Sequence, residues 1–175
     1  MRPWLLLLAF LLPAAAATPL DALFAELHAA SSPEEAKPIE QQILSEFERS
    51  GSPSIDLLMT RAAAAESAGD KDTAKKLYDA ITAIAPAFAE GWHRKGMLQA
   101  DAGDDEAAMV SLQKAVALNP RNFQALEQLA EMLEDYGDKP GALKLYRQAQ
   151  SLDPQFEGLQ RHIDGLSRAV EGQGI

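Results

Sequence analysis

Residues 89–122, AEGWHRKGMLQADAGDDEAAMVSLQKAVALNPRN, contain two apolar helical patterns that a Gly-Asp pair separates. Gly103 suits the left-handed backbone conformation that often ends a helix, and Asp104 suits the cap of the next helix. Asn119 and Pro120 close the second pattern, because proline cannot continue the helical hydrogen bonds and restricts the residue before it. The stretch therefore predicts two helices joined by a tight turn.

This pattern recurs at a spacing of 34 residues, in the units 55–88, 89–122 and 123–156. The columns that repeat are Gly69, Gly103, Gly137; Asp70, Asp104, Asp138; Ala74, Ala108, Ala142; Tyr78, Leu112, Tyr146; Pro86, Pro120, Pro154; and the small residues Ala62, Gly96, Ala130. Small residues at fixed places let two helices approach closely. One hairpin cannot bury both of its faces, so the units are expected to stack.

The segments on both sides of the three units also have helical patterns. Residues 18–54 predict a degenerate helical hairpin with helices over 20–30 and 33–50. Residues 157–175 predict a capping helix and a frayed tail, because apolar side chains occur every three or four residues as far as Val170.

Residues 1–17 have the features of a targeting signal. Arg2 precedes a short apolar run from Trp4 to Leu12, and Ala15 and Ala17 are small residues where a signal peptidase cleaves. The run is shorter than the ~20 residues that a membrane-spanning helix needs. Cleavage after Ala17 is therefore predicted, and an uncleaved anchor is the alternative.

The repeated columns resemble the tetratricopeptide repeat family over residues 55–156. The resemblance implies an all-α right-handed superhelix of helix hairpins, in which the first helix of each pair lines a concave groove. Arg61 and Lys95 depart from the family pattern, which usually has an apolar residue in this column. Either their alkyl stems pack while their charges reach the groove edge, or the first two units pack off the usual register.

Composition and motifs argue against catalysis and against nucleic acid as a partner. The chain of 175 residues has no cysteine and a net charge of -10, which would repel a phosphate backbone. No nucleotide-binding, hydrolase or metalloprotease motif occurs, and the three histidines fall on separate predicted helices. The sequence therefore predicts a non-catalytic protein with no cofactor and no metal site.

The helical period identifies fifteen positions on the groove side of the three first helices, of which eight are acidic and none is lysine or arginine. The residues predicted to bind a partner there are Asp56, Met59, Ala63, Glu66, Glu90, His93, Met97, Asp101, Glu127, Glu131, Glu134 and Asp135. The second helices contain lysines instead, so a basic segment would be attracted to the groove. Two alternatives remain open: the acidity serves only solubility, and His93 is a solvated residue without function.

These features together predict a non-catalytic protein–protein interaction module of the bacterial cell envelope. It would bind a basic or amphipathic peptide segment of another protein in an acidic concave groove. The alternative is an accessory or chaperone-like subunit of an envelope enzyme or maturation system. A cleaved signal implies a periplasmic or secreted protein, without stable membrane insertion after cleavage.

Overall fold

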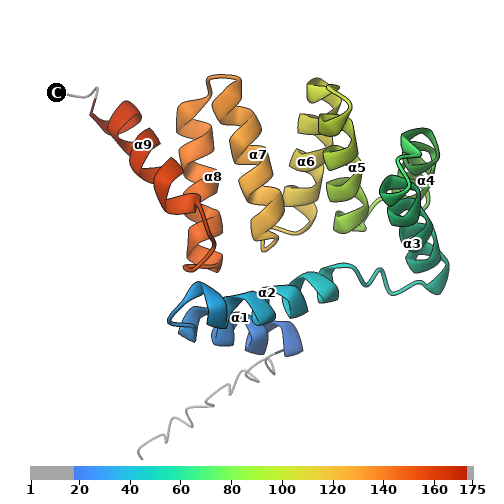
Figure 1. The fold of residues 1–175 in the computed structure, drawn as a ribbon, viewed down its shortest axis with the longest axis horizontal. Coiled ribbons are helices and arrows are strands. Elements are labelled where there is room, and N and C mark those ends of the chain that lie inside the picture. Colours follow the sequence, from blue (N-terminus) through green and yellow to red (C-terminus); the bar gives the residue numbers. More distant parts are fainter. Residues whose placement is uncertain (1–17, 173–175) are drawn as a thin grey trace, which may run out of the picture.

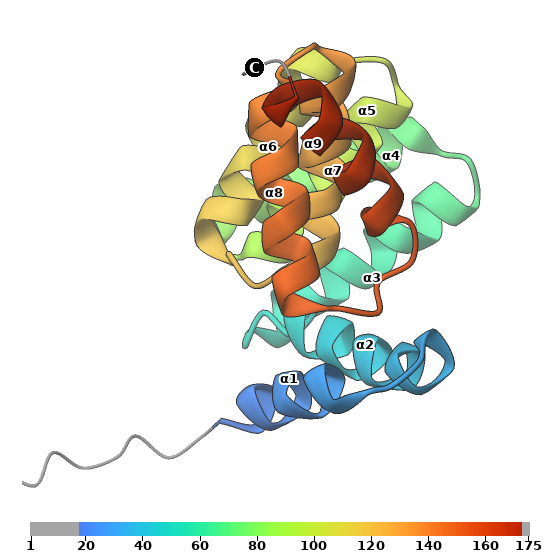
Figure 2. The ribbon, with the colours of Figure 1, turned by 90° about the vertical axis from the view of Figure 1, so that its left-hand side faces the viewer.

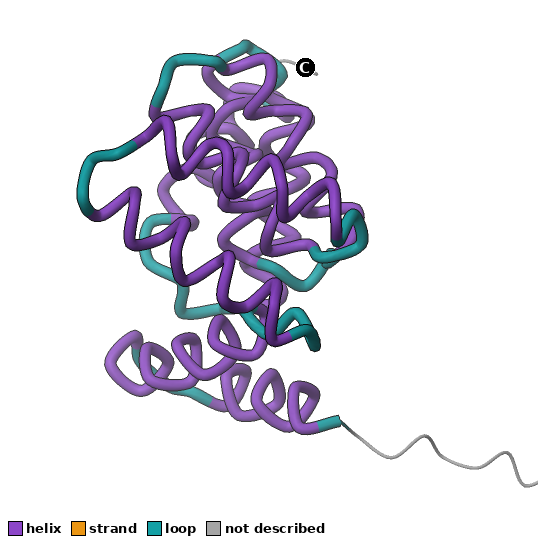
Figure 3. Tube along the Cα trace, turned by 90° about the vertical axis from the view of Figure 1, so that its right-hand side faces the viewer, coloured by secondary structure: helices purple, strands orange, loops and turns teal. Residues whose placement is uncertain are grey.

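The computed structural model describes residues 18–172, and this part of the chain consists of helices joined by short loops, without strands (Figures 1 and 3). The helices are α1 (Pro19–Ala29), α2 (Pro33–Phe47), α3 (Pro53–Ser67), α4 (Lys71–Ile84), α5 (Ala89–Asp101), α6 (Asp105–Leu118), α7 (Phe123–Asp135), α8 (Lys139–Leu152) and α9 (Leu159–Glu171). The predicted all-α class is confirmed. The predicted signal at 1–17 and the last three residues of the predicted tail lie outside the described residues.

The turn inside each hairpin has the geometry that the Gly-Asp column predicts. In the second unit Gly103 has a φ of 75°, and the Asp104 N–H donates to the Gln99 carbonyl oxygen at 2.9 Å, which closes the end of α5. The Asp104 carboxylate then accepts from the Ala107 N–H at the start of α6. The equivalent glycines and aspartates of the other two units do the same, so one local rule forms all three hairpins.

The columns of small residues lie where the two helices of a hairpin meet. Ala62, Ala108 and Ala142 are completely buried, and so is the second-unit glycine at position 96. A methyl group added at Gly96 would lie only 2.9 Å from a side-chain carbon of Leu112. The absence of side-chain volume at these positions therefore sets how closely the paired helices pack.

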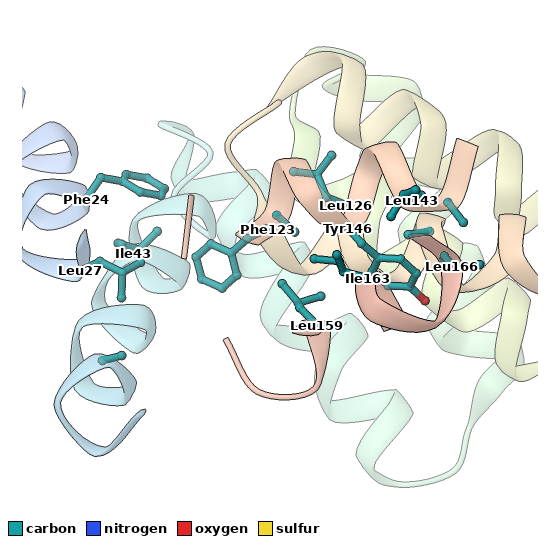
Figure 4. Packing of buried hydrophobic residues seen from close by; sticks show 14 of the residues in the cluster. Phe24, Leu27, Ile43, Phe123, Leu126, Leu143, Tyr146, Leu159, Ile163 and Leu166 are labelled. Carbon is teal, nitrogen blue, oxygen red and sulfur yellow. The ribbon is translucent and has the colours of Figure 1, made fainter. Parts of the chain in front are cut away.

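The hairpin α1–α2 does not stack on the first unit. It lies across the ends of α7, α8 and α9, with α2 running below the array toward α5 (Figures 1 and 2). Phe24, Leu27 and Ile43 of the hairpin share one buried cluster with Phe123 and Tyr146 of the third unit (Figure 4). Phe123 lies between the hairpin and the rest of this cluster, which makes it the central contact.

Polar contacts fasten the hairpin to the third unit at two loops. Arg121 donates to Asp21 at 2.6 Å and its guanidinium lies 4.0 Å from the centre of the Phe24 ring. The Gln155 side chain donates to the Ala30 carbonyl oxygen at 3.3 Å, and a ring nitrogen of His28 lies 2.8 Å from the Ser151 carbonyl oxygen. These partners are 100 or more positions apart in the sequence.

The buried apolar residues form two clusters, and the boundary between them lies at the second unit. The larger cluster joins α1, α2, α7, α8 and α9, whereas the smaller one joins α3 and α4 to Leu98 of α5. Lys95 lies at the boundary, where its ammonium contacts Asp79 of α4 at 2.7 Å and lies over the Trp92 ring. The Lys95 side chain is 22% exposed, and its charge is turned toward Asp79 of α4 and not toward the groove edge.

Candidate functional site

The first helices of successive units form one continuous face, which we call the groove face. A hollow separates α3 from α5, a side-chain hydrogen bond joins His93 of α5 to Gln128 of α7, and another joins Glu134 of α7 to His162 of α9. The helix α9 thus occupies the place of a first helix in a fourth unit. It extends the groove face beyond the three repeats.

Two hollows lie side by side on the groove face between α3 and α5. The larger, of about 500 Å³, is lined by Ser45, Glu48, Arg49, Asp56, Met59, Thr60, Ala63, Tyr78 and Arg94. The smaller, of about 390 Å³, is lined by Ala63, Glu66, Ser67, Lys71, Arg94, Leu98 and Asp101. Ala63 and Arg94 belong to both hollows, so the two form one depression with Arg94 at its centre.

Five residues predicted to bind a partner line this depression: Asp56, Met59, Ala63, Glu66 and Asp101. Two of their carboxylates are already engaged within the chain. Asp56 accepts from the backbone and the hydroxyl of Ser50, and Glu66 accepts from the Tyr78 hydroxyl at 2.5 Å.

Basic side chains also line this depression, although none of the fifteen predicted groove positions is lysine or arginine. Arg94 lies in the depression with 42% of its side chain exposed, and Arg49 and Lys71 lie at its borders. The Arg94 guanidinium donates to Glu90 at 2.7 Å and to Glu48, at the end of α2, at 3.0 Å. Arg94 therefore links the α1–α2 hairpin to the centre of the groove face.

Glu90 and His93, two further predicted groove residues, are buried between α5 and α7, with 4% and 3% of their surfaces exposed. One Glu90 oxygen lies 3.0 Å from His93 Nδ1 and accepts from the Asn122 amide, while His93 Nε2 lies 2.6 Å from the Gln128 amide oxygen. Their assignment to an open groove surface is corrected, and so is the alternative of a solvated His93. Both side chains join α5 to α7.

The charge state of Glu90 follows from this network. Burial raises the pKa of the Glu90 carboxyl, but the hydrogen bonds and charges of His93 and Arg94 outweigh burial and hold that pKa below its ordinary value. Glu90 is therefore ionised at neutral pH and holds Arg94 in place. A buried carboxylate with three donors around it is a structural element of the groove face, not a free binding group.

The acids of α7 form the second part of the groove face. Glu131 and Asp135 are exposed, whereas Glu134 accepts from the Tyr146 hydroxyl at 3.2 Å and lies 3.0 Å from Nδ1 of His162. The His162 ring also stacks on the Tyr146 ring, with centres 4.8 Å apart. Of the predicted acids on α7, Glu131 and Asp135 are the ones most available to a partner.

The last two predicted groove residues, Glu127 and Met97, are half-buried. Burial and the charge of Glu131 together raise the pKa of the Glu127 carboxyl to about 7, although the charge of His162 opposes the shift. A positive charge arriving at this place would favour the ionised form of Glu127. Met97 lines neither hollow.

Sequence reasoning missed Arg94, Glu48 and His162. Arg94 and His162 belong to a column, Thr60, Arg94, Gln128 and His162, that lies one position after the column predicted to face the groove. The 34-residue period could have revealed this column. Glu48 had no such signal, because its approach to Arg94 depends on where the hairpin docks.

The described part of the chain lacks two other features, a metal-binding cluster and a membrane-spanning helix. Among residues 18–172, no group of three or more histidines and acids is arranged to hold a metal ion. In the same part of the chain, no helix is both long enough and apolar enough to cross a membrane.

Comparison with known proteins agrees with this architecture. The family model described as "Tetratricopeptide repeat" matches residues 89–122. A TPR repeat-containing protein of Rhizobium etli is 29% identical over 153 residues, which cover 87% of this chain and 75% of that protein.

Solved structures are similar in fold. The crystal structure of MamA is similar with a TM-score of 0.61 at 19% identity, over 90% of this chain and 86% of that one. The Yersinia enterocolitica type III secretion chaperone SycD, in complex with a peptide of the translocator YopD, gives a TM-score of 0.59 at 18% identity, over 71% of this chain and 97% of that one. The family model identifies a tetratricopeptide repeat at residues 89–122, and the 34-residue period and the similar relative support the same kind of repeat in the units on either side of it.

Proposed function

We propose that this protein is a non-catalytic interaction module that binds a peptide segment of another protein along the groove face. The observation that carries this proposal is the depression between α3 and α5, which continues into the exposed acids of α7. Its length across successive first helices suits an extended or helical segment better than a small molecule. The similar chaperone SycD, solved with a translocator peptide, supports this kind of use.

The chemistry of the face favours a basic, amphipathic segment. Glu131 and Asp135 would attract lysine or arginine side chains, and Met59 and Ala63 offer apolar contact in the depression. Each solvent-exposed ion pair contributes only about 0–1 kcal/mol, so affinity requires several pairs together with apolar contact. Salt should therefore slow association more than it speeds dissociation.

We also propose export to the bacterial cell envelope through cleavage after Ala17. Thr18 caps α1, and its backbone nitrogen lies 3.0 Å from the Asp21 carboxylate, a partner equally suited to a free ammonium group. Mass spectrometry of protein from the envelope fraction tests this proposal. A mature chain beginning at Thr18 or next to it is expected, and an intact Met1 would contradict cleavage.

The binding proposal is tested by affinity capture with the purified chain as bait, followed by titration of the captured partner's segment. The double variant Glu131→Lys and Asp135→Lys should weaken binding of that segment at least about tenfold at low salt, because two attractive charges become repulsive. Glu134 is left unchanged, since its contacts with Tyr146 and His162 hold α7, α8 and α9 together.

The matched control changes the net charge of the protein by the same amount, but on the second helices. Asp72 and Glu106 are exposed residues of α4 and α6, and Asp72→Lys with Glu106→Lys should leave the affinity within about twofold. Equal weakening by both double variants would show an effect of net charge alone. Unchanged binding in the α7 variant would exclude α7 from the binding site and contradict the proposed attraction of a basic segment to its acids.

A further inference from the structure

The junction between the α1–α2 hairpin and the third unit contains a carboxyl group with an unmet hydrogen bond. Asp153, in the loop after α8, is completely buried. Its Oδ1 accepts from the Gln155 N–H at 3.1 Å, while its Oδ2 is the one buried side-chain polar atom in residues 18–172 without a partner. An orphan acceptor of this kind costs about 1–3 kcal/mol, so a donor for it is expected.

The side chain that faces Asp153 from the hairpin is another acid. Glu40 of α2 lies close enough to Asp153 for one added proton to join the two carboxyl groups by a hydrogen bond, and it lines a small cavity of about 140 Å³ with Pro33, Lys37, Phe156 and Glu157. Two carboxylates in contact repel each other, but a carboxylic acid donates to a carboxylate. One proton between Glu40 and Asp153 gives Oδ2 its missing donor.

We propose that Glu40 and Asp153 share one proton and form a latch that holds the α1–α2 hairpin against the third unit, and that loss of this proton loosens the hairpin.

The surrounding charges determine when the proton leaves. Lys37 of α2 favours the ionised form of Glu40, Glu157 opposes it, and His28 of α1 lies where a positive charge would favour ionised Asp153. Both ring nitrogens of His28 lie within 2.8 Å of carbonyl oxygens, those of Phe24 and Ser151, and both can donate only when the ring is cationic.

Burial and the negative charge of Asp153 raise the pKa of Glu40 from its ordinary value of 4.5 to about 7, and burial raises the pKa of Asp153 as well. A raised carboxyl pKa means that the docked state binds the proton more tightly than the released state. Docking is therefore strongest below about pH 4.5, weakens between pH 4.5 and 7, and is weakest above pH 7.

Release of the hairpin would change the groove face. The end of α2 contributes Ser45, Glu48 and Arg49 to the larger hollow, and Glu48 pairs with Arg94. Movement of α2 would open that hollow and free one side of Arg94. The latch itself does not depend on the proposed binding function. Only the meaning of the opened hollow for a partner rests on that function.

Hydrogen–deuterium exchange of the whole chain tests the latch without any partner. After correction for intrinsic exchange rates, the amides of α1 and α2 should lose on the order of tenfold in protection between pH 5 and pH 7.5. The variant Glu40→Gln, whose amide donates to Asp153 at any pH, should match the wild type at pH 5 and be more protected at pH 7.5.

The variant Asp153→Asn, whose amide donates to the Glu40 carboxylate, should behave like Glu40→Gln. Glu26→Gln is the matched control, because Glu26 is an exposed acid of the same hairpin and should leave the wild-type response intact. Equal protection of wild type at both pH values, or a full wild-type slope in both latch variants, would overturn the proposal.

Discussion

Glu90 is the residue on which the groove face most depends, because one buried carboxylate orients three side chains from two helices. Replacing Glu90 by Ala leaves His93 and Asn122 without an acceptor and removes the nearer partner of Arg94. The free energy of unfolding should fall by about 1–3 kcal/mol. Urea denaturation at pH 7, followed by circular dichroism, measures this change.

The control for this substitution is Glu131→Ala on α7, where the side chain is exposed and the same number of atoms is lost. Its effect should remain within about 0.5 kcal/mol. If Glu90→Ala is equally mild, the buried network does not contribute to stability.

At the residue scale, the sequence predicts which residues are small and which are capping, but not the orientation of the groove side chains. Ala62, Ala108 and Asp104 follow from the period because each obeys a local rule of helix packing or capping. His93 and Arg94 are neighbours in the sequence, yet one is buried and the other faces a hollow. Which of the two side chains is buried depends on how α5 is rotated about its own axis, by less than the angle between neighbouring residues. Helical periodicity does not determine that rotation so finely.

At the scale of the elements, glycine has opposite effects in two places. It stabilises the turn between paired helices and destabilises the interior of a helix. Gly103 has a φ of 75° with open space around it, so Gly103→Ala should cost about 1 kcal/mol through backbone strain alone. Gly165 lies inside α9 with equally open surroundings, so Gly165→Ala should stabilise by up to about 1 kcal/mol.

Thermal unfolding of the two alanine variants reports the effect of backbone conformation without an effect of packing, because neither added methyl group would contact a neighbouring atom. Opposite shifts in Tm are expected. A loss of stability in both variants would mean that the glycines matter for a contact and not for their backbone angles.

Also at this scale, the existence of α1, α2 and α9 could be predicted, but the docking of the hairpin could not. Each helix follows from its own apolar spacing and caps, which are local. The position of α1–α2 depends on Phe24 joining the buried cluster that contains Phe123, and on Asp21 meeting Arg121, about a hundred residues away. Nothing in the local pattern distinguishes this arrangement from stacking on the first unit.

At the scale of the whole molecule, the two apolar clusters predict uneven stability. The first unit, α3 and α4, has the smaller cluster and meets the second unit across a boundary that includes the Lys95–Asp79 ion pair. Amide protons of α3 and α4 should therefore exchange at least about tenfold faster than those of α7 and α8 under native conditions. Uniform exchange across the array would show that the two clusters unfold as one unit.

A chain of stacked repeats is normally open-ended, because each unit contacts only its neighbours and further units can be added at either end. The hairpin α1–α2 restricts that freedom here, since it bonds at once to Arg94 of the second unit, to Arg121 in the loop before α7 and to Ser151 near the end of α8. Inserting or deleting 34 residues between these anchor points would leave the hairpin too short or too long to reach both. The hairpin thus fixes how many residues separate the second unit from the end of the third, but it sets no limit on units added before α3 or after α9.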